Sequence, residues 1–306
     1  MKTFVIRLLL LLALLQQISL YSACGTTIED LVALTEQKRT VLVSGEVRYT
    51  VTEGIITEIG AVKLRDLCRN VSFQDSVKSK DIDNLIACDG TKLITRKNTL
   101  FYSGDNFVLT EKVPSSAFDA KLVKLAGLQE KDVVFKMSAF NGLYSFLDPF
   151  RNQLQLNQTD LPDNYPAESV LSLDLTLANY KNLLLPVPDR TIKINKDGEN
   201  LTVRFQRSAN GHEMQKYTIR DGTIYLTEID AKMGKSGTIV DKFLLNYSGH
   251  PGSGVNIKSP SIIIDITQPE AGPIMFKYYQ IEEWIIRKIL DTEFLIEAPP
   301  GVELIR

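Results

Sequence analysis

The chain has 306 residues, with 35 basic and 37 acidic side chains and a formal net charge of −2. A nearly balanced, slightly acidic composition excludes the basic footprint that marks nucleic-acid-binding proteins. The length is ample for a buried core, and one large domain or two closely packed halves both fit it.

Residues 1–23 predict a secretory signal peptide. Lys2 and Arg7 give it a positive start, and an apolar run of eight residues, from Leu8 to Leu15, follows. A membrane-spanning helix needs roughly 20 apolar residues, so this run is too short for one. We therefore expect export and cleavage near Cys24. Loss of the two signal cations leaves 33 basic against 37 acidic residues in the mature chain, a net charge of −4.

The cysteine count of three is odd, which calls for an explanation in an exported protein. Cys68 and Cys88 lie near strand-like runs and are a candidate disulfide. Cys24 follows two small residues after the apolar run, as in bacterial lipoprotein signals, although Tyr21 stands where leucine is usual. Two readings remain open: a membrane-anchored protein lipidated at Cys24, held firmly by several acyl chains, and a soluble secreted protein cut nearby.

Four Asn-x-Ser/Thr sequons are present. They would accept glycans only if the source were eukaryotic. Their asparagines are Asn70, Asn157, Asn200 and Asn246.

The first half of the mature chain predicts a helix followed by a β-meander. Thr26 and Glu29 have capping-box spacing, so a helix is expected over residues 26–39. From residue 43 the pattern alternates with a period of two, which predicts a strand; Glu53-Gly54 reads as a turn, with further strands over residues 55–67. Further strands are expected in the runs 85–88, 92–95, 100–102 and 107–109.

The middle of the chain predicts two helices separated by a loop. Phe118, Leu122 and Leu125 share one face of a short helix that Gly127 can end. Residues 149–166 are rich in Asn, Gln, Asp and Pro and predict the connection between the halves 24–148 and 167–306. A second helix is expected over residues 169–181.

The last part predicts a second meander. Strands are expected on both sides of Asp221-Gly222, a strong hairpin signal, and on both sides of residues 196–200. Three more are expected at residues 242–247, 261–267 and 274–286. Without βαβ alternation, the chain predicts an α+β, mainly β fold: a single domain forming an antiparallel, partly closed, half-open barrel with two or three helices packed on it.

The sequence contains no convincing catalytic or metal-binding set, so we expect neither an enzyme nor a cofactor. His212 and His250 lack partners at metal-ligand spacing and are expected to be solvated in glycine-rich turns. Glu282 and Glu283 are adjacent, so on a regular strand they would point to opposite faces and could not form a carboxylate pair.

Aromatic residues, 13 Phe and 11 Tyr, concentrate on the predicted strands. Two interpretations stay open, because filled cores and cavity walls use the same residue types. One is an ordinary β core. The other is a curved sheet whose concave face lines a cavity for an acyl chain.

The order of motifs resembles the Lol-type lipoprotein carrier superfamily, especially its divergent outer-membrane lipoprotein-sorting-like members in planctomycetes and related bacteria. The matching segments are the short helix after the signal, a strand opening with Ser-Gly-Glu-Val-Arg-Tyr, an Asp-Gly hairpin, a leucine- and glycine-containing middle segment, and a terminal Phe-x-x-x-x-Pro-Pro-Gly strand. These are residues 26–39, 44–49, 87–93, 118–128 and 294–302.

The resemblance implies an unclosed antiparallel barrel with a hydrophobic concavity that accepts lipid or lipoprotein acyl chains. It supplies no functional residues, because the arginine that closes the lid in the best-known carriers has no match here. The expected function is a non-enzymatic envelope lipoprotein that binds acyl chains and reaches the membrane through Cys24. The alternatives are a protein-interaction or signalling β-domain that uses its sheet edges, and an unrecognised secreted hydrolase.

Overall fold

The computed structural model describes most of the β-rich part of the chain. The described residues are 43–56, 94–128, 131–159, 192–208, 211–220, 223–233, 239–247, 260–268 and 274–305. The helices expected at residues 26–39 and 169–181, and the strands expected at residues 57–67, 85–88 and 92–93, lie outside these ranges.

Within the described ranges, fourteen strands form one sheet. They are β1 (Ser44–Ile56), β2 (Ile94–Ser103), β3 (Asn106–Pro114), β4 (Asp132–Phe140), β5 (Leu143–Asp148), β6 (Gln153–Gln158), β7 (Ile192–Asp197), β8 (Asn200–Ser208), β9 (Gly211–Arg220), β10 (Thr223–Met233), β11 (Ile239–Asn246), β12 (Ile262–Gln268), β13 (Ile274–Ile286) and β14 (Glu303–Ile305). Their order is β14-β6-β5-β4-β3-β2-β1-β13-β12-β11-β10-β9-β8-β7, and every pairing is antiparallel except β14 with β6.

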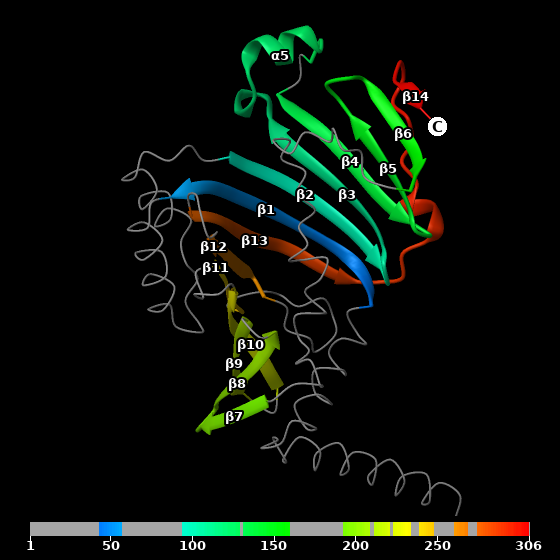
Figure 1. The fold of residues 1–306 in the computed structure, drawn as a ribbon. Coiled ribbons are helices and arrows are strands. Elements are labelled where there is room, and N and C mark those ends of the chain that lie inside the picture. Colours follow the sequence, from blue (N-terminus) through cyan, green and yellow to red (C-terminus); the bar gives the residue numbers. More distant parts are fainter. Residues whose placement is uncertain are drawn as a thin grey trace, which may run out of the picture.

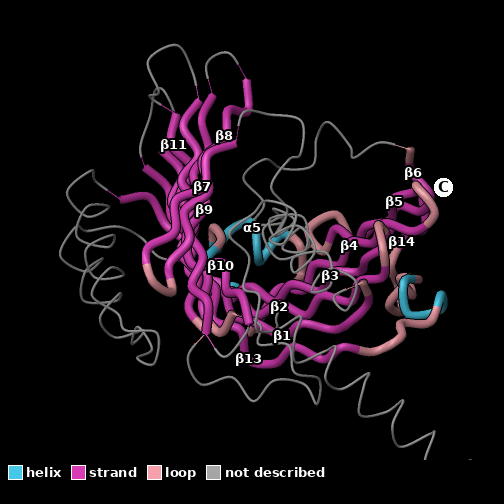
Figure 2. The backbone as a smooth tube through the Cα atoms, turned by 90° about the horizontal axis from the view of Figure 1, so that it is seen from below, coloured by secondary structure: helices cyan, strands magenta, loops and turns pink. Residues whose placement is uncertain are grey.

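The sheet is open and strongly curved. Seen from below, β7–β11 form one wall and β2–β6 the other, with β1 and β13 at the base between them (Figure 2). The mainly β, antiparallel prediction is confirmed. The partly closed barrel is corrected to an open sheet, because β14 and β7 end the strand order on opposite sides. Twist and coiling alone bend a sheet of this width without closing it.

Helix α5 (Ala120–Leu125) is the one α-helix in the described part of the chain, and it confirms the helix expected near residues 118–128. The Asp119 carboxylate caps it by accepting the amide hydrogen of Lys121 at 2.7 Å. Gly127 follows with φ +66°, the left-handed conformation that ends helices. Leu122 and Leu125, which were expected to share one face of this helix, are 45% and 86% exposed.

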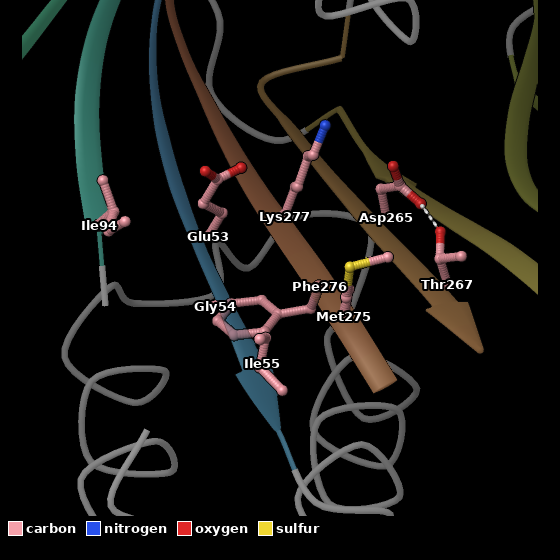
Figure 3. A pocket seen from close by; sticks show the side chains of 9 residues that line it. All are labelled: Glu53, Gly54, Ile55, Ile94, Asp265, Thr267, Met275, Phe276 and Lys277. Atoms are coloured by element: carbon pink, nitrogen blue, oxygen red, sulfur yellow. Dashed lines mark hydrogen bonds between the residues drawn. The ribbon is translucent and has the colours of Figure 1, made fainter. Parts of the chain in front are cut away.

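Strand β1 runs through the dipeptide that was expected to be a turn. Gly54 pairs with Phe276 in the register of β1 and β13, and the Phe276 ring lies against it (Figure 3). An aromatic ring beside a glycine compensates for the side chain that the glycine lacks, so the strand continues to Ile56.

Part of the polar stretch expected as a connecting loop is strand β6. Leu154 is 1% exposed, and β5 and β14 pair with this strand on its two sides. Polar Gln and Asn residues are tolerated because the strand lies one place from the edge and is short. The remaining residues of that stretch, from 160 to 166, lie outside the described ranges.

Strands β1 and β13 form the central seam of the sheet. Their register shifts at Arg48 and Tyr49, which marks a β-bulge in β13. Because of the bulge, Glu282 accepts a hydrogen bond from the Thr50 hydroxyl at 2.8 Å, and Glu283 pairs with Arg48 at 3.0 Å. Both carboxylates therefore contact side chains of the outer face, so the expectation that they point to opposite faces is wrong.

The hairpins expected in the second meander are confirmed. β9 ends just before Asp221-Gly222 and β10 begins just after it. β7 and β8 lie on either side of the turn at Gly198. His212 lies within β9, exposed, rather than in a turn as expected. His250 lies outside the described residues.

Residues 287–305, here called the C-terminal strap, cross the outer face of β2–β6. Phe294, in the short helix η2 (Asp291–Phe294), is 1% exposed and stacks on Phe140 with ring centroids 5.6 Å apart. Arg287 donates to Glu46 and Glu293, and hydrogen bonds from Arg287 and from the Leu290 amide lower the pKa of Glu293. The strap ends in β14, which extends the sheet beyond β6.

Candidate functional site

The concave face of the sheet is apolar and buried along the central strands. In β1, Val47, Tyr49 and Val51 are at most 1% exposed, as expected for alternate residues that share one face. Phe118, just before α5, packs on Phe135 of this same face with ring centroids 6.0 Å apart, and α5 lies beyond one end of β3 and β4 (Figure 1). Other buried members of this cluster are Leu100, Leu109, Met137, Ile263, Tyr279, Ile281 and Trp284.

Tyr102 and Trp284 place a polar contact in this face. The Trp284 indole nitrogen donates to the Tyr102 hydroxyl at 2.9 Å, and both side chains are buried. Burial raises the pKa of Tyr102 to about 12, and the hydrogen bond from Trp284 only partly offsets it. The hydroxyl therefore remains protonated throughout the neutral range.

A buried ionic group interrupts the apolar face on β1, β2 and β3. Arg96 is fully buried, with Nη1 2.5 Å from Glu111 Oε1 and Nη2 2.6 Å from Glu53 Oε2. The Asn98 amide donates to the same Glu111 oxygen at 3.3 Å. Burying charges is costly unless they are paired and hydrogen-bonded, so this arrangement holds Arg96 tightly. The Glu53 side chain is 21% exposed, so the ionic group extends from the buried core to the solvent-accessible surface.

A pocket of about 560 Å³ opens where the ionic group reaches the strand ends. It is lined by Glu53, Gly54, Ile55, Ile94, Asp265, Thr267, Met275, Phe276 and Lys277 (Figure 3). These residues come from four adjacent strands, β2, β1, β13 and β12. Ile55 and Met275 are 54% and 46% exposed, so an apolar rim surrounds a charged interior.

A second hollow, of about 450 Å³, lies beside α5. Phe118, Val123 and Leu128 contribute its apolar walls, and Lys124 lies at its edge. Phe118 also contacts Phe150 edge-on at 4.9 Å, which fixes this segment to the sheet. Phe118, which precedes α5, is therefore packed on the sheet, while Leu122 and Leu125 of α5 are exposed.

The structure brings few of the residues singled out from the sequence near the pocket. Cys24, Cys68, Cys88 and Asn70 lie outside the described residues, so lipidation and the disulfide stay predictions. Asn157 and Asn200 are exposed, and Asn246 is half-buried. None of the three asparagines lines either hollow.

Sequence reasoning missed the charged residues of the concave face. Arg96, Asn98 and Glu111 lie at alternate positions of β2 and β3, on the face that is otherwise apolar. The available signal was the polar interruption Thr-Arg-Lys-Asn-Thr between Ile94 and Leu100.

The described ranges contain no helix that is long and apolar enough to cross a membrane. They also contain no group of three or more His, Cys, Asp or Glu side chains placed to hold a metal ion.

No family model matches the sequence, and no curated protein matches it either. Among solved structures, the chain is similar to a LolA superfamily protein from Nitrosomonas europaea, at 10% identity and a TM-score of 0.44, over 89% of this chain and 99% of that one. It is also similar to a DUF1329 family protein from Desulfovibrio piger, at 12% identity and a TM-score of 0.43, over 88% and 97% of the two chains. The first structure carries the superfamily name to which the sequence motifs pointed. Both likenesses are distant and assign no ligand, partner or residue role to this chain.

Proposed function

We propose that this chain is a non-enzymatic envelope protein that holds an acyl chain of a lipid or lipoprotein in the pocket at the ends of β1, β2, β12 and β13. One observation carries the proposal: an apolar rim, formed by Ile55 and Met275, opens onto the concave face of a curved sheet. The pocket volume of about 560 Å³ lies in the range of small-ligand sites.

The energetics favour an apolar ligand at this position. Each methylene group removed from water contributes about 0.8 kcal/mol, so six to eight buried methylenes contribute about 5–6 kcal/mol before the cost of association. A ligand would also cover the two exposed rim residues, which otherwise face water.

Native mass spectrometry of the purified protein tests the proposal. We expect a bound mass of lipid size, and displacement of a fluorescent fatty acid by lipid extract. Ile55→Asp and Met275→Asp should each weaken fatty-acid binding about tenfold or more, because a carboxylate on the rim opposes entry of an apolar chain. Both positions are exposed, so the variants should still fold.

Leu304→Asp is the matched control. Leu304 is 49% exposed and lies on β14, at the end of the strand order opposite β7, and it does not line the pocket. Fatty-acid binding should be unchanged in it. A protein that binds no lipid, or rim variants that bind as the unchanged protein does, would overturn the proposal.

A further inference from the structure

Helix α5 presents an apolar stripe to solvent. Leu125 is 86% exposed, the largest exposed fraction of any large apolar side chain in the described ranges, and Leu122 is 45% exposed. Residues three apart lie on the same side of a helix, so the two leucines form one stripe. Val123, half-buried, lines the hollow beside α5. The helix therefore packs through one side and presents its leucines on another.

Two lysines accompany this stripe. Lys121 and Lys124 directly precede the two leucines, and both are exposed. They are also three residues apart, so they form a basic stripe next to the apolar one. Lysine stems lie along apolar surface while the ammonium group stays in water. Exposed leucines beside lysines are the pattern of helices that lie in the interface of a lipid bilayer. These four residues are here called the α5 tip.

Further lysines lie near the base of the helix. Lys131 is exposed, and its carbonyl oxygen accepts a hydrogen bond from the Ser115 amide at 2.9 Å. Lys112, near the end of β3, is exposed and lies opposite exposed Lys97 of β2. Like charges directly opposite each other destabilise a sheet, so an anionic partner near this end would relieve a cost that the folded chain bears alone.

The lysines of this stretch outnumber its acidic residues. Residues 112–128, 131 and 132, which the structure describes, contain four lysines and two acidic residues, a net charge of +2. One of the two, Asp119, caps α5 by accepting the amide hydrogens of Lys121 and Leu122 at 2.7 and 3.4 Å. Its carboxylate is therefore directed to the start of the helix. The charge of this stretch complements an anionic surface.

The α5 tip lies at the end of the sheet where the pocket opens. β2 and β3 are antiparallel, so the start of β2, which holds Ile94 of the pocket, lies beside the end of β3 that leads to α5. Figure 1 shows α5 beyond this end of the strands. Phe118 fixes the helix to the sheet through the Phe135 and Phe150 rings, with centroids 6.0 and 4.9 Å away. A surface that binds the tip therefore approaches the pocket end of the sheet.

We propose that the α5 tip docks on an anionic lipid surface, with Leu122 and Leu125 entering the head-group region and the lysines contacting lipid phosphates. The inference goes beyond the proposed function, because it concerns the surface that the protein binds rather than the ligand that its pocket holds. The contact is reversible, because one short helix buries too little apolar area for stable anchoring. It orients the chain on a membrane but does not retain it in a washed membrane fraction.

Vesicle co-sedimentation tests the docking. The full mature chain carrying Cys24→Ser is used, so that no lipid anchor contributes. It is mixed with vesicles of phosphatidylcholine alone and with vesicles that also contain phosphatidylglycerol. We expect about tenfold or more tighter binding to the anionic vesicles, because each lysine near such a surface adds to the attraction. Added salt should narrow the difference.

Variants of the tip separate the apolar and the basic contributions. Leu125→Asp should weaken binding to the anionic vesicles about tenfold or more, because an apolar contact is replaced by a negative charge. The double variant Lys121→Gln, Lys124→Gln should lose most of the preference for anionic vesicles and leave binding to phosphatidylcholine nearly unchanged. These side chains are exposed, so the variants should fold, which circular dichroism checks.

Matched controls lie elsewhere on the molecule. Leu304→Asp makes the same change at an exposed leucine of β14, and the double variant Lys193→Gln, Lys288→Gln removes two exposed lysines from β7 and from the start of the C-terminal strap. Both should bind anionic vesicles as the Cys24→Ser chain does. Loss of binding in the lysine control equal to that in the tip variant would show a general charge effect and overturn the proposal.

A fluorescent variant reports whether the tip enters lipid. The chain has one tryptophan, Trp284, which is 5% exposed, so its emission is a constant background. In Leu125→Trp the added emission should shift to the blue on anionic vesicles and be quenched by brominated lipid. Emission that stays as in water while the chain is bound would show that the tip does not enter the membrane.

The outcomes distinguish docking from acyl binding. Leu125 does not line the pocket, so Leu125→Asp should bind fluorescent fatty acid as the Cys24→Ser chain does. Vesicle binding without fatty-acid binding would support docking and refute the proposed function. Fatty-acid binding without vesicle binding, or vesicle binding that the tip variants do not change, would refute docking. A dimer that Leu125→Asp abolishes, in a chain that binds no vesicles, would assign the tip to a second copy and also refute docking.

Discussion

Gly45, Tyr102 and Trp284 meet where β1, β2 and β13 lie side by side. Gly45 is opposite Tyr102 on one strand and Ile286 on the other. A Cβ at Gly45 would lie 2.6 Å from the carbonyl oxygen of Ile285 and 3.0 Å from the Tyr102 hydroxyl, so a larger residue forces the backbone to shift. The glycine leaves room for the Tyr102 hydroxyl to accept the hydrogen bond from Trp284. At the residue scale, this contact fixes the base of the curve.

The raised pKa of Tyr102 predicts a loss of stability at high pH. Its pKa is about 12 in the folded protein against 10 for an ordinary tyrosine. Between these values the unfolded chain has lost the proton that the folded chain keeps, so the free energy of unfolding falls as pH rises. The stabilisation is complete below pH 10, and the loss is about 1.4 kcal/mol for each pH unit between 10 and 12.

Urea unfolding followed by circular dichroism from pH 8 to pH 11 measures this loss. In Tyr102→Phe, the fall in unfolding free energy that Tyr102 causes at high pH should disappear. The variant should also be less stable at neutral pH, because Trp284 loses its hydrogen-bond acceptor. Tyr144→Phe, at a half-buried position of β5, is the control and should retain the full dependence. An identical pH dependence in Tyr102→Phe and the unchanged protein would contradict the assignment.

At the scale of elements, β14 protects one edge of the sheet. Its pairing with β6 is supported by the Glu303 amide, which donates to the Asn152 carbonyl at 3.0 Å. The Asn152 side-chain amide donates to the Gly301 carbonyl at 2.8 Å, and Gln153 donates to Glu303 at 2.9 Å. Without this short strand, β6 would present its backbone groups to solvent or to another chain.

Deletion of residues 299–306 should therefore expose β6. We expect faster amide exchange confined to Gln153–Gln158, a loss of about 2 kcal/mol in unfolding free energy from the hydrogen bonds removed, and concentration-dependent self-association. Hydrogen exchange with mass spectrometry and sedimentation velocity measure these effects. Leu304→Asp keeps the backbone pairing and should remain protected; unchanged exchange in the deletion variant would show that β14 does not cover this edge.

The sequence predicted elements well where the pattern was local. The hairpins around Asp221-Gly222 and Gly198, and the helix capped by Asp119, follow from turn and capping chemistry within a few residues. It failed where a distant partner decides the conformation. Gly54 continues a strand because Phe276, far along the chain, lies against it. Strand β6 likewise has a distant partner, β14, on one side, in addition to its sequence neighbour β5.

The pocket could not be predicted for a related reason. Glu53 is far in sequence from Asp265 and Lys277, and only the register of β1, β12 and β13 places the three in one row. Arg96 and Glu111 read as solvent-facing residues until that register shows that they face the core. Surface and buried ion pairs use the same residue types, so composition does not distinguish them.

On the scale of the whole molecule, the sheet interleaves the two sequence halves. β13 and β14 come from the end of the chain, yet β13 pairs with β1 and β14 pairs with β6. The C-terminal strap joins these two strands across the outer face, so the concave face is left for the pocket. A ligand held there would be positioned by the two base strands, β1 and β13, and by their neighbours β2 and β12.

Attachment of the whole molecule to a membrane is the remaining part of the proposal, and it depends on Cys24. If Cys24 carries acyl chains, the protein is an anchored acceptor rather than a soluble shuttle, because several chains hold a protein on a membrane where one chain does not. Cys24→Ser should move the protein from the membrane fraction to the soluble fraction, and the intact mass should fall by that of the lipid. Cys68→Ser is the matched control and should remain membrane-bound. Unchanged fractionation of Cys24→Ser would refute lipidation and leave a secreted protein, while the lipid-binding test on the purified chain would be unaffected.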